Sequence, residues 1–297
     1  MNFDNKGFVY FMVLVVTAIW SVTFVSTKEL LAVLSPTEIL VYRYVIAYAA
    51  FCLISPSPIV PKNLKDEGIF ALCGVLGVSL YFLLENFALY YSTASNVSLI
   101  VSTAPMLTGI VAHFFTDDEK MTRGFLWGCV FGLGGVFLII FNGHFILHLN
   151  PLGDAFAILG ALSFAVYSIL IRNINKGYSP VEITRKTFFY ALLSLVPLLF
   201  TPAFNWKPYV LMDTTVIFHL TFLGIFASAL CFIVWNRVIW ALGAVKANNL
   251  IYLTPPGTMI AAALLIDERI TVFAVAGCLL ILVGVFAAQF EKSSSRS

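Results

Sequence analysis

Two charged residues lie inside apolar stretches of the chain, where they could bind an ion or a polar solute. Glu85 lies in SLYFLLENFALYY (79–91), beside Asn86, and Arg43 lies in ILVYRYVIAYAA (39–50). Ionisable side chains in such stretches are rare, and they usually face a bundle interior or a cavity. Desolvation and a nearby Arg shift the proton affinity of a carboxylate in opposite directions. Glu85 is therefore a candidate proton-coupling group.

Glu85 and Arg43 are expected at similar depth below the same surface. Each lies about six or seven residues from the end of its stretch, which is roughly 10 Å at 1.5 Å per helical residue. One interpretation is a structural ion pair, which would lower the cost of burying both charges. The other is functional, with Glu85 titrating or Arg43 holding a substrate carboxylate. The two interpretations are not exclusive.

Other polar and aromatic residues in the apolar stretches are candidates for the wall of a cavity. Tyr81 lies four residues before Glu85 and so shares its helical face. The remaining candidates are Trp20, Asn86, Ser98, Trp235, Asn236, Asn248 and Tyr252. Trp20 equally suits a membrane interface, and Asn236 could simply bond a neighbouring helix.

Pro105 and Pro255 fall within apolar stretches, where each is expected to kink a helix. Proline lacks a backbone N–H, so it leaves a carbonyl that a solute or a cavity group could use. The alternative is a kink that only improves packing.

Catalytic and metal-binding patterns are not found in the sequence. His144 and His148 are four residues apart in a predicted loop, without a carboxylate or cysteine ligand beside them. The five cysteines fall in apolar runs and form no CxxC. No GxSxG, HExxH, P-loop or GxGxxG fingerprint occurs. We therefore expect no enzyme activity, no metal and no cofactor.

The composition places these residues in a membrane. Hydrophobic residues make up 60% of the 297 positions and charged residues 11%, against about a quarter charged in soluble domains. Because a span needs roughly 20 apolar residues and must satisfy its own backbone, ten helical spans are predicted. They are 8–27, 37–55, 69–91, 94–115, 122–142, 151–171, 181–201, 214–236, 245–266 and 271–290.

The distribution of basic residues predicts the orientation. With the N-terminus in the cytoplasm, 13 of the 17 Lys and Arg residues fall on the cytoplasmic side. Lys28, Lys207 and Arg269 fall outside, and Arg43 lies within a span. Both termini are therefore expected to be cytoplasmic, in a multi-pass protein of the cytoplasmic membrane.

The chain contains an internal repeat. The segment EKMTRGFLWGCVFGLGGVF (119–137) aligns with ERITVFAVAGCLLILVGVF (268–286), and SPTEI (35–39) aligns with SPVEI (179–183). The halves, 1–148 and 149–297, each hold five predicted spans and so enter the membrane from opposite faces. The predicted fold is an all-α integral membrane protein of ten transmembrane helices in two inverted five-helix repeats, an architecture typical of transporters.

These repeated segments, together with VTAIWSVTFVSTK, VYRYVIAY and GDAFAILGALSFAVYSILIR, resemble the EamA-type transporters of the drug/metabolite transporter superfamily. The resemblance covers both halves. It implies secondary transport, with export of amino acids or other small metabolites.

The prediction from the sequence is a secondary active transporter. It would export small polar metabolites such as amino acids by alternating access, with proton coupling as one energy source. The alternatives are uniport or exchange of metabolites or drug-like solutes, a channel, and a membrane-embedded enzyme. The expected partners are a small-molecule substrate and the lipid bilayer, without nucleic acid, and a repeat within one chain permits function as a monomer.

Overall fold

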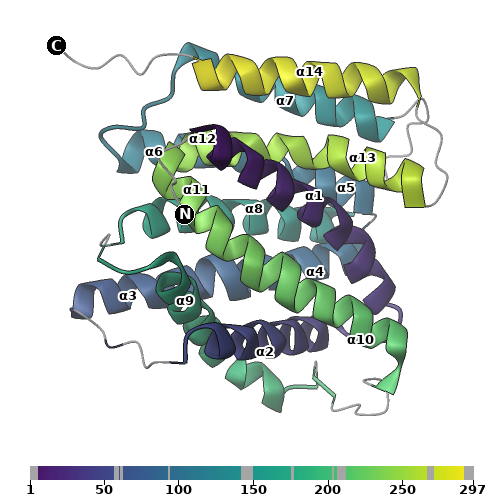
Figure 1. The fold of residues 1–297 in the computed structure, drawn as a ribbon. Coiled ribbons are helices and arrows are strands. Elements are labelled where there is room, and N and C mark those ends of the chain that lie inside the picture. Colours follow the sequence, from purple (N-terminus) through teal and green to yellow (C-terminus); the bar gives the residue numbers. More distant parts are fainter. Residues whose placement is uncertain are drawn as a thin grey trace.

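The computed structural model describes residues 6–56, 60, 63–92, 94–141, 150–174, 177–202, 204–205, 212–265 and 271–290. Helices form all the regular structure of this described part (Figure 1). In chain order they are α1 (Lys6–Leu30), α2 (Pro36–Ile54), α3 (Leu64–Cys73), η1 (Gly74–Leu80), α4 (Tyr81–Tyr91), α5 (Ala94–Val101), α6 (Ala104–Phe115), α7 (Arg123–Phe141), α8 (Pro151–Arg172), α9 (Pro180–Leu195), η2 (Val196–Phe200), α10 (Thr214–Thr221), η4 (Phe222–Leu230), α11 (Cys231–Leu242), α12 (Ala244–Asn249), η5 (Leu250–Leu253), α13 (Thr254–Leu265) and α14 (Val272–Phe290).

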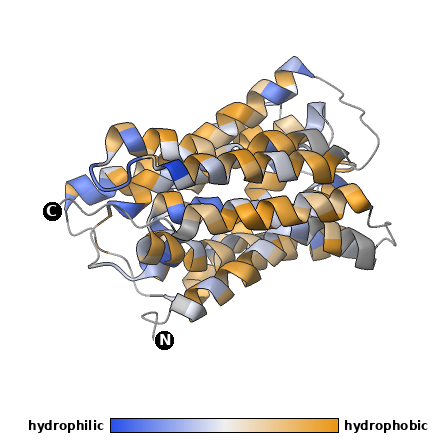
Figure 2. Cartoon of the chain, turned by 90° about the horizontal axis from the view of Figure 1, so that it is seen from above, coloured by the Kyte–Doolittle hydropathy of each residue, from blue (hydrophilic) through white to orange (hydrophobic). Residues whose placement is uncertain are grey.

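Seven of the helical stretches are long and apolar enough to cross a membrane. They are Gly7–Leu30, Pro36–Ile54, Leu64–Tyr91, Arg123–Ile140, Pro151–Arg172, Pro180–Phe200 and Thr214–Leu242. Two shorter apolar helices, Leu99–Phe115 and Val272–Ala288, fall in the fourth and tenth stretches of the sequence prediction. Hydrophobic residues dominate the bodies of the helices in Figure 2. The protein is therefore an all-helical, multi-pass membrane protein.

The repeated SPxE motif begins a helix in each half of the chain. Ser35 accepts a hydrogen bond from the backbone N–H of Glu38, and the Glu38 carboxylate accepts one from the N–H of Ser35. Ser179 and Glu182 form the same pair at the start of α9. This reciprocal capping satisfies N–H groups that would otherwise lack a partner. The proline between them suits the first helical turn.

Two long spans contain π-helical segments in their middle. In the third stretch, η1 lies between α3 and α4, and in the eighth stretch, η4 lies between α10 and α11. The π-helical segments η1 and η4 end at Leu80 and Leu230. Glu85 and Trp235 therefore each lie five residues after the end of a π-helical segment. Such segments often occur at functional sites because they reorient the side chains that follow.

The helices around the two candidate prolines are interrupted. Ser102 and Thr103 separate helix α5 from helix α6, and Pro105 lies in the first turn of α6. The 3₁₀ turn η5 precedes α13, in which Pro255 occupies the first turn. Proline is tolerated there because the first N–H groups of a helix have no partner within it.

Glycines allow α7 and α14 to pack closely, side by side along one edge of the molecule (Figure 1). A Cβ on Gly135 would lie 2.5 Å from the carbonyl oxygen of Gly277, and a Cβ on Gly277 would lie 2.5 Å from the carbonyl oxygen of Gly135. Neither helix therefore tolerates a side chain at this contact. The remaining helices surround a core whose largest buried side chains include Arg43, Tyr44 and Trp235.

Candidate functional site

Arg43 lies in the interior of the bundle, on α2, and only 2% of its surface is exposed. Its Nε donates a hydrogen bond to Ser228 Oγ on η4 at 2.6 Å. The guanidinium carbon lies 4.2 Å from the centre of the Phe82 ring on α4. Its Nη2 is buried and has no hydrogen-bond partner among the described residues. A residue that is always charged is thus held by a hydroxyl and a ring face rather than by a carboxylate.

Glu85 is also buried, and its partner is Tyr81, one turn earlier on α4. The Tyr81 hydroxyl donates to Glu85 Oε2 at 2.5 Å, as their shared helical face predicts. Within the described residues, the ion pairs shorter than 4 Å do not include Glu85 with Arg43. The direct ion pair considered from the sequence is therefore not formed in this conformation. The two charges interact only at longer range.

Trp20 and Trp235 meet in the same region, with their ring centres 5.0 Å apart. Trp20 Nε1 donates to the carbonyl oxygen of Ala227 on η4 at 3.1 Å, so Trp20 faces the bundle rather than a lipid interface. Trp235 is fully buried, and its Nε1 has no hydrogen-bond partner among the described residues. Phe232 joins both regions, with ring centres 5.9 Å from Phe82 and 6.2 Å from Trp20.

Asn86 and Asn236 connect helices. Asn86 Nδ2 donates to the carbonyl oxygen of Pro36 at the start of α2, at 3.1 Å. Asn236 Nδ2 donates to Thr184 Oγ1 on α9 at 3.0 Å, and its Oδ1 accepts from the Tyr167 hydroxyl at 2.5 Å. Asn236 is thus engaged on both sides of its amide, which is the helix-bonding role weighed for it from the sequence.

The candidates near Pro255, Asn248 and Tyr252, contact α6 and α7 rather than the helices around Arg43. Asn248 is buried and donates to Thr108 Oγ1 on α6 at 2.8 Å. Tyr252 is buried against α7, where a Cβ on Gly132 would lie 2.8 Å from its ring. The side chain of Ser98 lies outside the described residues, as does the loop that carries His144 and His148.

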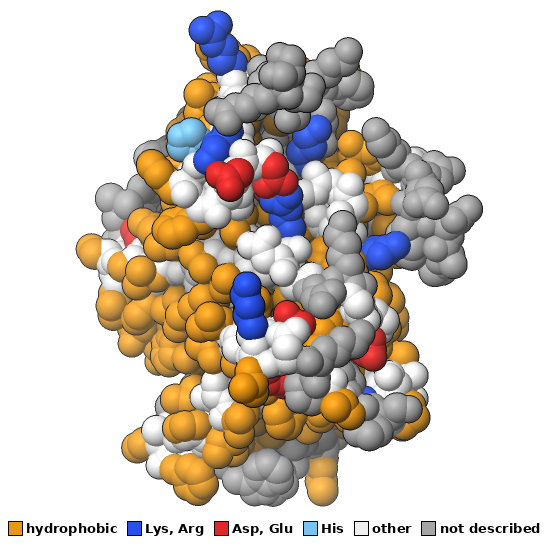
Figure 3. All heavy atoms as spheres, turned by 90° about the vertical axis from the view of Figure 1, so that its left-hand side faces the viewer, with side chains coloured by type: hydrophobic (Ala, Val, Ile, Leu, Met, Phe, Trp, Pro, Cys, Tyr) orange, Lys and Arg blue, Asp and Glu red, His pale blue; other side chains and the backbone are white. Residues whose placement is uncertain are grey.

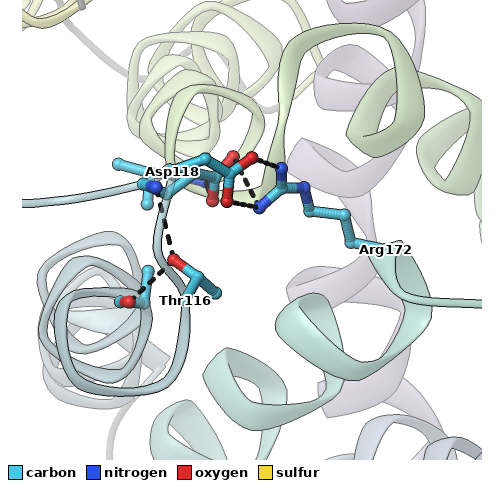
Figure 4. Close-up of polar contacts among 6 residues, drawn as sticks. Thr116, Asp118 and Arg172 are labelled. Atoms are coloured by element: carbon cyan, nitrogen blue, oxygen red, sulfur yellow. Dashed lines mark hydrogen bonds and ion pairs between the residues drawn. The ribbon is translucent and has the colours of Figure 1, made fainter. Parts of the chain in front are cut away.

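A second polar cluster lies at the end of the bundle where α8 ends, here called the Arg172 end. Figure 3 shows that Lys, Arg, Asp and Glu side chains gather on this face. Arg172 contacts both oxygens of Asp118, one of them at 3.0 Å, in a bidentate pair (Figure 4). Its Nη1 also lies 3.6 Å from Glu119 Oε1. The loop after α6 is thereby fastened to the end of α8.

Glu119 extends this cluster to a third element. Its Oε2 accepts a hydrogen bond from the backbone N–H of Val245 at 3.2 Å, in the first turn of α12. Gly243, just before α12, has φ +85° and ψ 162°, and a Cβ on it would lie 1.9 Å from Glu119 Oε1. We call Asp118, Glu119, Arg172 and Gly243 the clamp. The hydrogen bond with Arg172 lowers the pKa of Asp118, whereas burial raises the pKa of Glu119.

A third cluster at the Arg172 end joins α3 to α9. Lys186 is buried, and its Nζ lies 2.5 Å from Glu67 Oε2. The Tyr190 hydroxyl donates to Glu67 Oε1 at 2.5 Å. Ion pairs within the described residues thus connect α8 to the loop after α6, and α9 to α3. No group of three or more His, Cys, Asp or Glu in the described part is placed to hold a metal ion.

Comparison with known proteins decides the family. The model of the EamA-like transporter family matches residues 7–141 and 151–289. The chain belongs to the EamA-like transporter family. Its relatives and the family are named as transporters rather than enzymes, and the multi-pass helical fold agrees with a cell-membrane protein.

Individual relatives of this transporter cover most of its length. It is 28% identical to an uncharacterized transporter, YyaM, of Bacillus subtilis, over 95% of this chain and 93% of the relative. It is 25% identical to a probable amino-acid metabolite efflux pump of Escherichia coli, over 94% of both chains. It is 26% identical to a probable terminal-alkyne amino-acid exporter of Streptantibioticus cattleyicolor, over 74% of this chain and 72% of the relative.

The fold of the transporter also resembles a solved crystal structure. The TM-score is 0.74 over 96% of this chain and 97% of that chain, at 18% sequence identity. At this identity the likeness concerns the fold alone.

Several residues of the transporter's polar clusters are not singled out by the sequence. Ser228, the partner of Arg43, is 185 positions away from it, and one serine in an apolar stretch carries no signal of its own. The Asp118–Arg172 pair spans 54 positions, and the sequence offers no pattern that joins the two residues. The best available signal is the repeat, because Glu119 begins one of the segments that recur in the second half.

Proposed function

We propose that the protein is a secondary active transporter that exports small polar metabolites, such as amino acids, by alternating access and in exchange for protons. Ten membrane spans would form two inverted repeats, 1–148 and 149–297. The separate matches of the family model to residues 7–141 and 151–289 support this division. With positive charges inside, the Arg172 end faces the cytoplasm.

The observation that carries this proposal is the pair of ionisable groups in the middle of the bundle. Glu85 and Arg43 are each more than nine-tenths buried, and neither has an oppositely charged partner within 4 Å among the described residues. Burying charges without such partners is costly, so residues of this kind mark ion and substrate pathways in membrane proteins. If Glu85 and Arg43 were only structural, replacing both with apolar residues would increase the stability of the bundle.

The arrangement of helices supports alternating access. Side chains from α1, α2, α4 and α11 meet around Arg43, and these helices come from both proposed repeats. Rocking of one repeat against the other would open this region to each side in turn. In the conformation described, the clamp and the Lys186–Glu67 pair hold the Arg172 end together.

Glu85 would provide the coupling. Its bond from Tyr81 comes from its own helix, so protonation of Glu85 changes its charge without breaking a contact between helices. A proton taken from the outer side and released to the cytoplasm would accompany each exported solute. Two relatives are named as an amino-acid exporter and an amino-acid metabolite efflux pump, which supports amino acids as the solute class and export as the direction.

The test is transport by purified protein in proteoliposomes that carry an imposed pH gradient. We expect saturable uptake and counterflow of labelled amino acids, stimulated by the gradient. The Glu85→Gln variant should keep counterflow and lose the response to the gradient, because the amide has the shape of the acid but does not titrate.

Glu29→Gln is the matched control, since Glu29 is an exposed carboxylate at the end of α1. It should respond to pH as the unmodified protein does. A Glu85→Gln protein with an unchanged pH response would refute the coupling role. Flux that does not saturate and shows no counterflow would indicate a channel instead.

A further inference from the structure

Arg43 carries a positive charge that the described protein groups satisfy only in part. Its Nε is bonded to Ser228 and one face of its guanidinium lies against Phe82, while Nη2 has no hydrogen-bond partner among the described residues. Arg presents its N–H groups as a planar fork that matches the two oxygens of a carboxylate. An anion that completes this fork would offset much of the cost of burying the charge.

Trp235 contributes a second unsatisfied donor to the same cluster. Its ring is fully buried and its Nε1 has no partner among the described residues, although indole N–H groups usually find one when buried. Trp20, 5.0 Å away, does satisfy its own Nε1, with the carbonyl oxygen of Ala227. Of these two indoles in contact, Trp235 is the one whose N–H has no partner among the described residues.

Both donors adjoin one series of neighbouring aromatic rings, in which Arg43 lies on Phe82 and Trp235 lies against Trp20. Phe232 and Trp235 are three positions apart on α11 and so share a helical face, and Ser228 lies four positions before Phe232, near the end of η4. Ser228 bonds Arg43, and Phe232 packs between Phe82 and Trp20. Two N–H donors without acceptors, set among apolar rings, favour a solute that brings its own acceptors and an apolar body.

We propose that Arg43 Nη2 and Trp235 Nε1 bind the carboxylate of the transported solute, and that Trp20, Phe82 and Phe232 contact its apolar part. The solute class is then a small carboxylate with an apolar or aromatic side chain. This proposal rests on the proposed transport function and specifies its substrate. Because Arg43 and Trp235 are buried, the solute enters when α2 moves away from the helix formed by η4 and α11.

The experiment compares three ligands of nearly the same shape on the full-length protein in detergent. They are L-phenylalanine, L-phenylalaninamide, in which an amide replaces the carboxylate, and phenethylamine, which lacks the carboxylate altogether. Thermal stabilisation gives the apparent affinity for each. We expect L-phenylalanine to bind about tenfold or more tightly than the other two, since the amide keeps one carbonyl acceptor but loses the negative charge and the second oxygen, and phenethylamine loses both acceptors. The same order is expected in counterflow.

Two variants connect this preference to the proposed residues. Arg43→Lys keeps the charge but loses the fork, and it should reduce the preference for the acid over the amide by about tenfold. Trp235→Phe keeps an aromatic ring and loses only the N–H, and it should reduce that preference about threefold. If Arg43→Lys does not fold, Trp235→Phe still tests the proposal.

The outcomes separate this inference from the transport function. Counterflow of all three ligands with equal affinity would overturn the carboxylate site and leave the transport function standing. An acid preference that survives unchanged in both variants would overturn the assignment to Arg43 and Trp235. The absence of saturable flux for the whole panel would overturn both proposals.

Discussion

The charges of this protein are handled in two contrasting ways. At the Arg172 end, Arg172 meets Asp118 and Glu119, and Lys186 meets Glu67, so cations face carboxylates directly. In the middle of the bundle, Arg43 and Glu85 each take neutral partners, Ser228 and Tyr81. The side chain of Asp118 is 64% exposed, whereas Arg43 is 2% exposed.

For the Arg172–Asp118 pair and for Arg43, this difference is the reverse of what stability alone would favour, whereas the buried Lys186 has the carboxylate partner that its burial requires. Exposed ion pairs contribute little, because water already solvates their charges. Buried charges are the ones that most need opposite partners. Under the proposed alternating access, pairing at the surface would suit contacts that form and break as an end of the bundle closes and opens. Incomplete pairing in the interior would likewise leave Arg43 able to bind the proposed solute.

The contrast between the paired charges of the Arg172 end and the incompletely paired Arg43 can be removed by placing a permanent carboxylate beside Arg43. Ser228→Asp would place an anion where the hydroxyl now accepts from Nε, 2.6 Å away. The new carboxylate would compete with the solute, so we expect transport to fall by about tenfold or more. The measurement is counterflow, with thermal unfolding to confirm that the protein folds.

Ser228→Asn is the control for this substitution, because it has a similar size and a neutral acceptor. It should transport more than Ser228→Asp does and keep the acid preference. Undiminished flux in Ser228→Asp would show that the partners of Arg43 do not affect transport.

The clamp can be tested at the residue that shapes it. Gly243 has a backbone conformation that is essentially restricted to glycine, and its missing Cβ leaves the space that Glu119 occupies. Gly243→Ala should lower the free energy of unfolding by about 1–3 kcal/mol. It should also displace the Glu119 carboxylate from the N–H of Val245. Thermal unfolding would measure the first effect, and labelling of an introduced cysteine near Val245 the second.

Gly68→Ala is the matched control, since nothing lies within 4 Å of the added Cβ and Gly68 is inside α3. It should raise stability by about 0.5–1 kcal/mol, because alanine favours helix. Equal effects of the two substitutions would contradict the special role of Gly243.

Local features of this fold could be predicted from the sequence, and contacts between distant segments could not. The SPxE motifs and the glycines of α7 and α14 act over one helical turn or by their small size, so their roles follow from residue type and spacing. The apolar length of the spans is likewise visible. Ser228 and Asp118 acquire their roles only when helices distant in sequence come together.

The candidate site shows the same limit. Tyr81 is predicted beside Glu85 because the two residues are four apart on one helix, and the structure joins them. Arg43 and Glu85 are predicted at one depth, but depth does not determine the direction in which each side chain points. The two asparagines, Asn86 and Asn236, connect helices instead of offering both ends of their amides to a solute.

The smallest expected effect is the loss of the surface pair in the clamp, through Asp118→Asn. Because Asp118 is largely exposed, we expect a change below about 1 kcal/mol in the free energy of unfolding at pH 7. Arg172 lowers the pKa of Asp118, so the pair stabilises the fold above the ordinary aspartate pKa of about 3.9, and this contribution is lost as the pH falls through the lower value of the folded state. The difference between Asp118→Asn and the unmodified protein should therefore shrink on acidification.

Glu119 should show the opposite pH dependence. Burial raises its pKa, so its ionisation opposes folding at neutral pH, and this penalty vanishes as the pH falls toward the ordinary glutamate value of about 4.3. Glu119→Gln should thus differ most from the unmodified protein at neutral pH. Thermal unfolding of both variants from pH 7 to about pH 2, in buffers of equal ionic strength, separates the two carboxylates, because the Glu119 effect changes above the ordinary glutamate pKa and the Asp118 effect below the ordinary aspartate pKa. If the stability differences of both variants from the unmodified protein change in parallel with pH, exposure does not distinguish the two carboxylates of the clamp. The contrast between surface and interior charges would then rest on Arg43 and Glu85 alone.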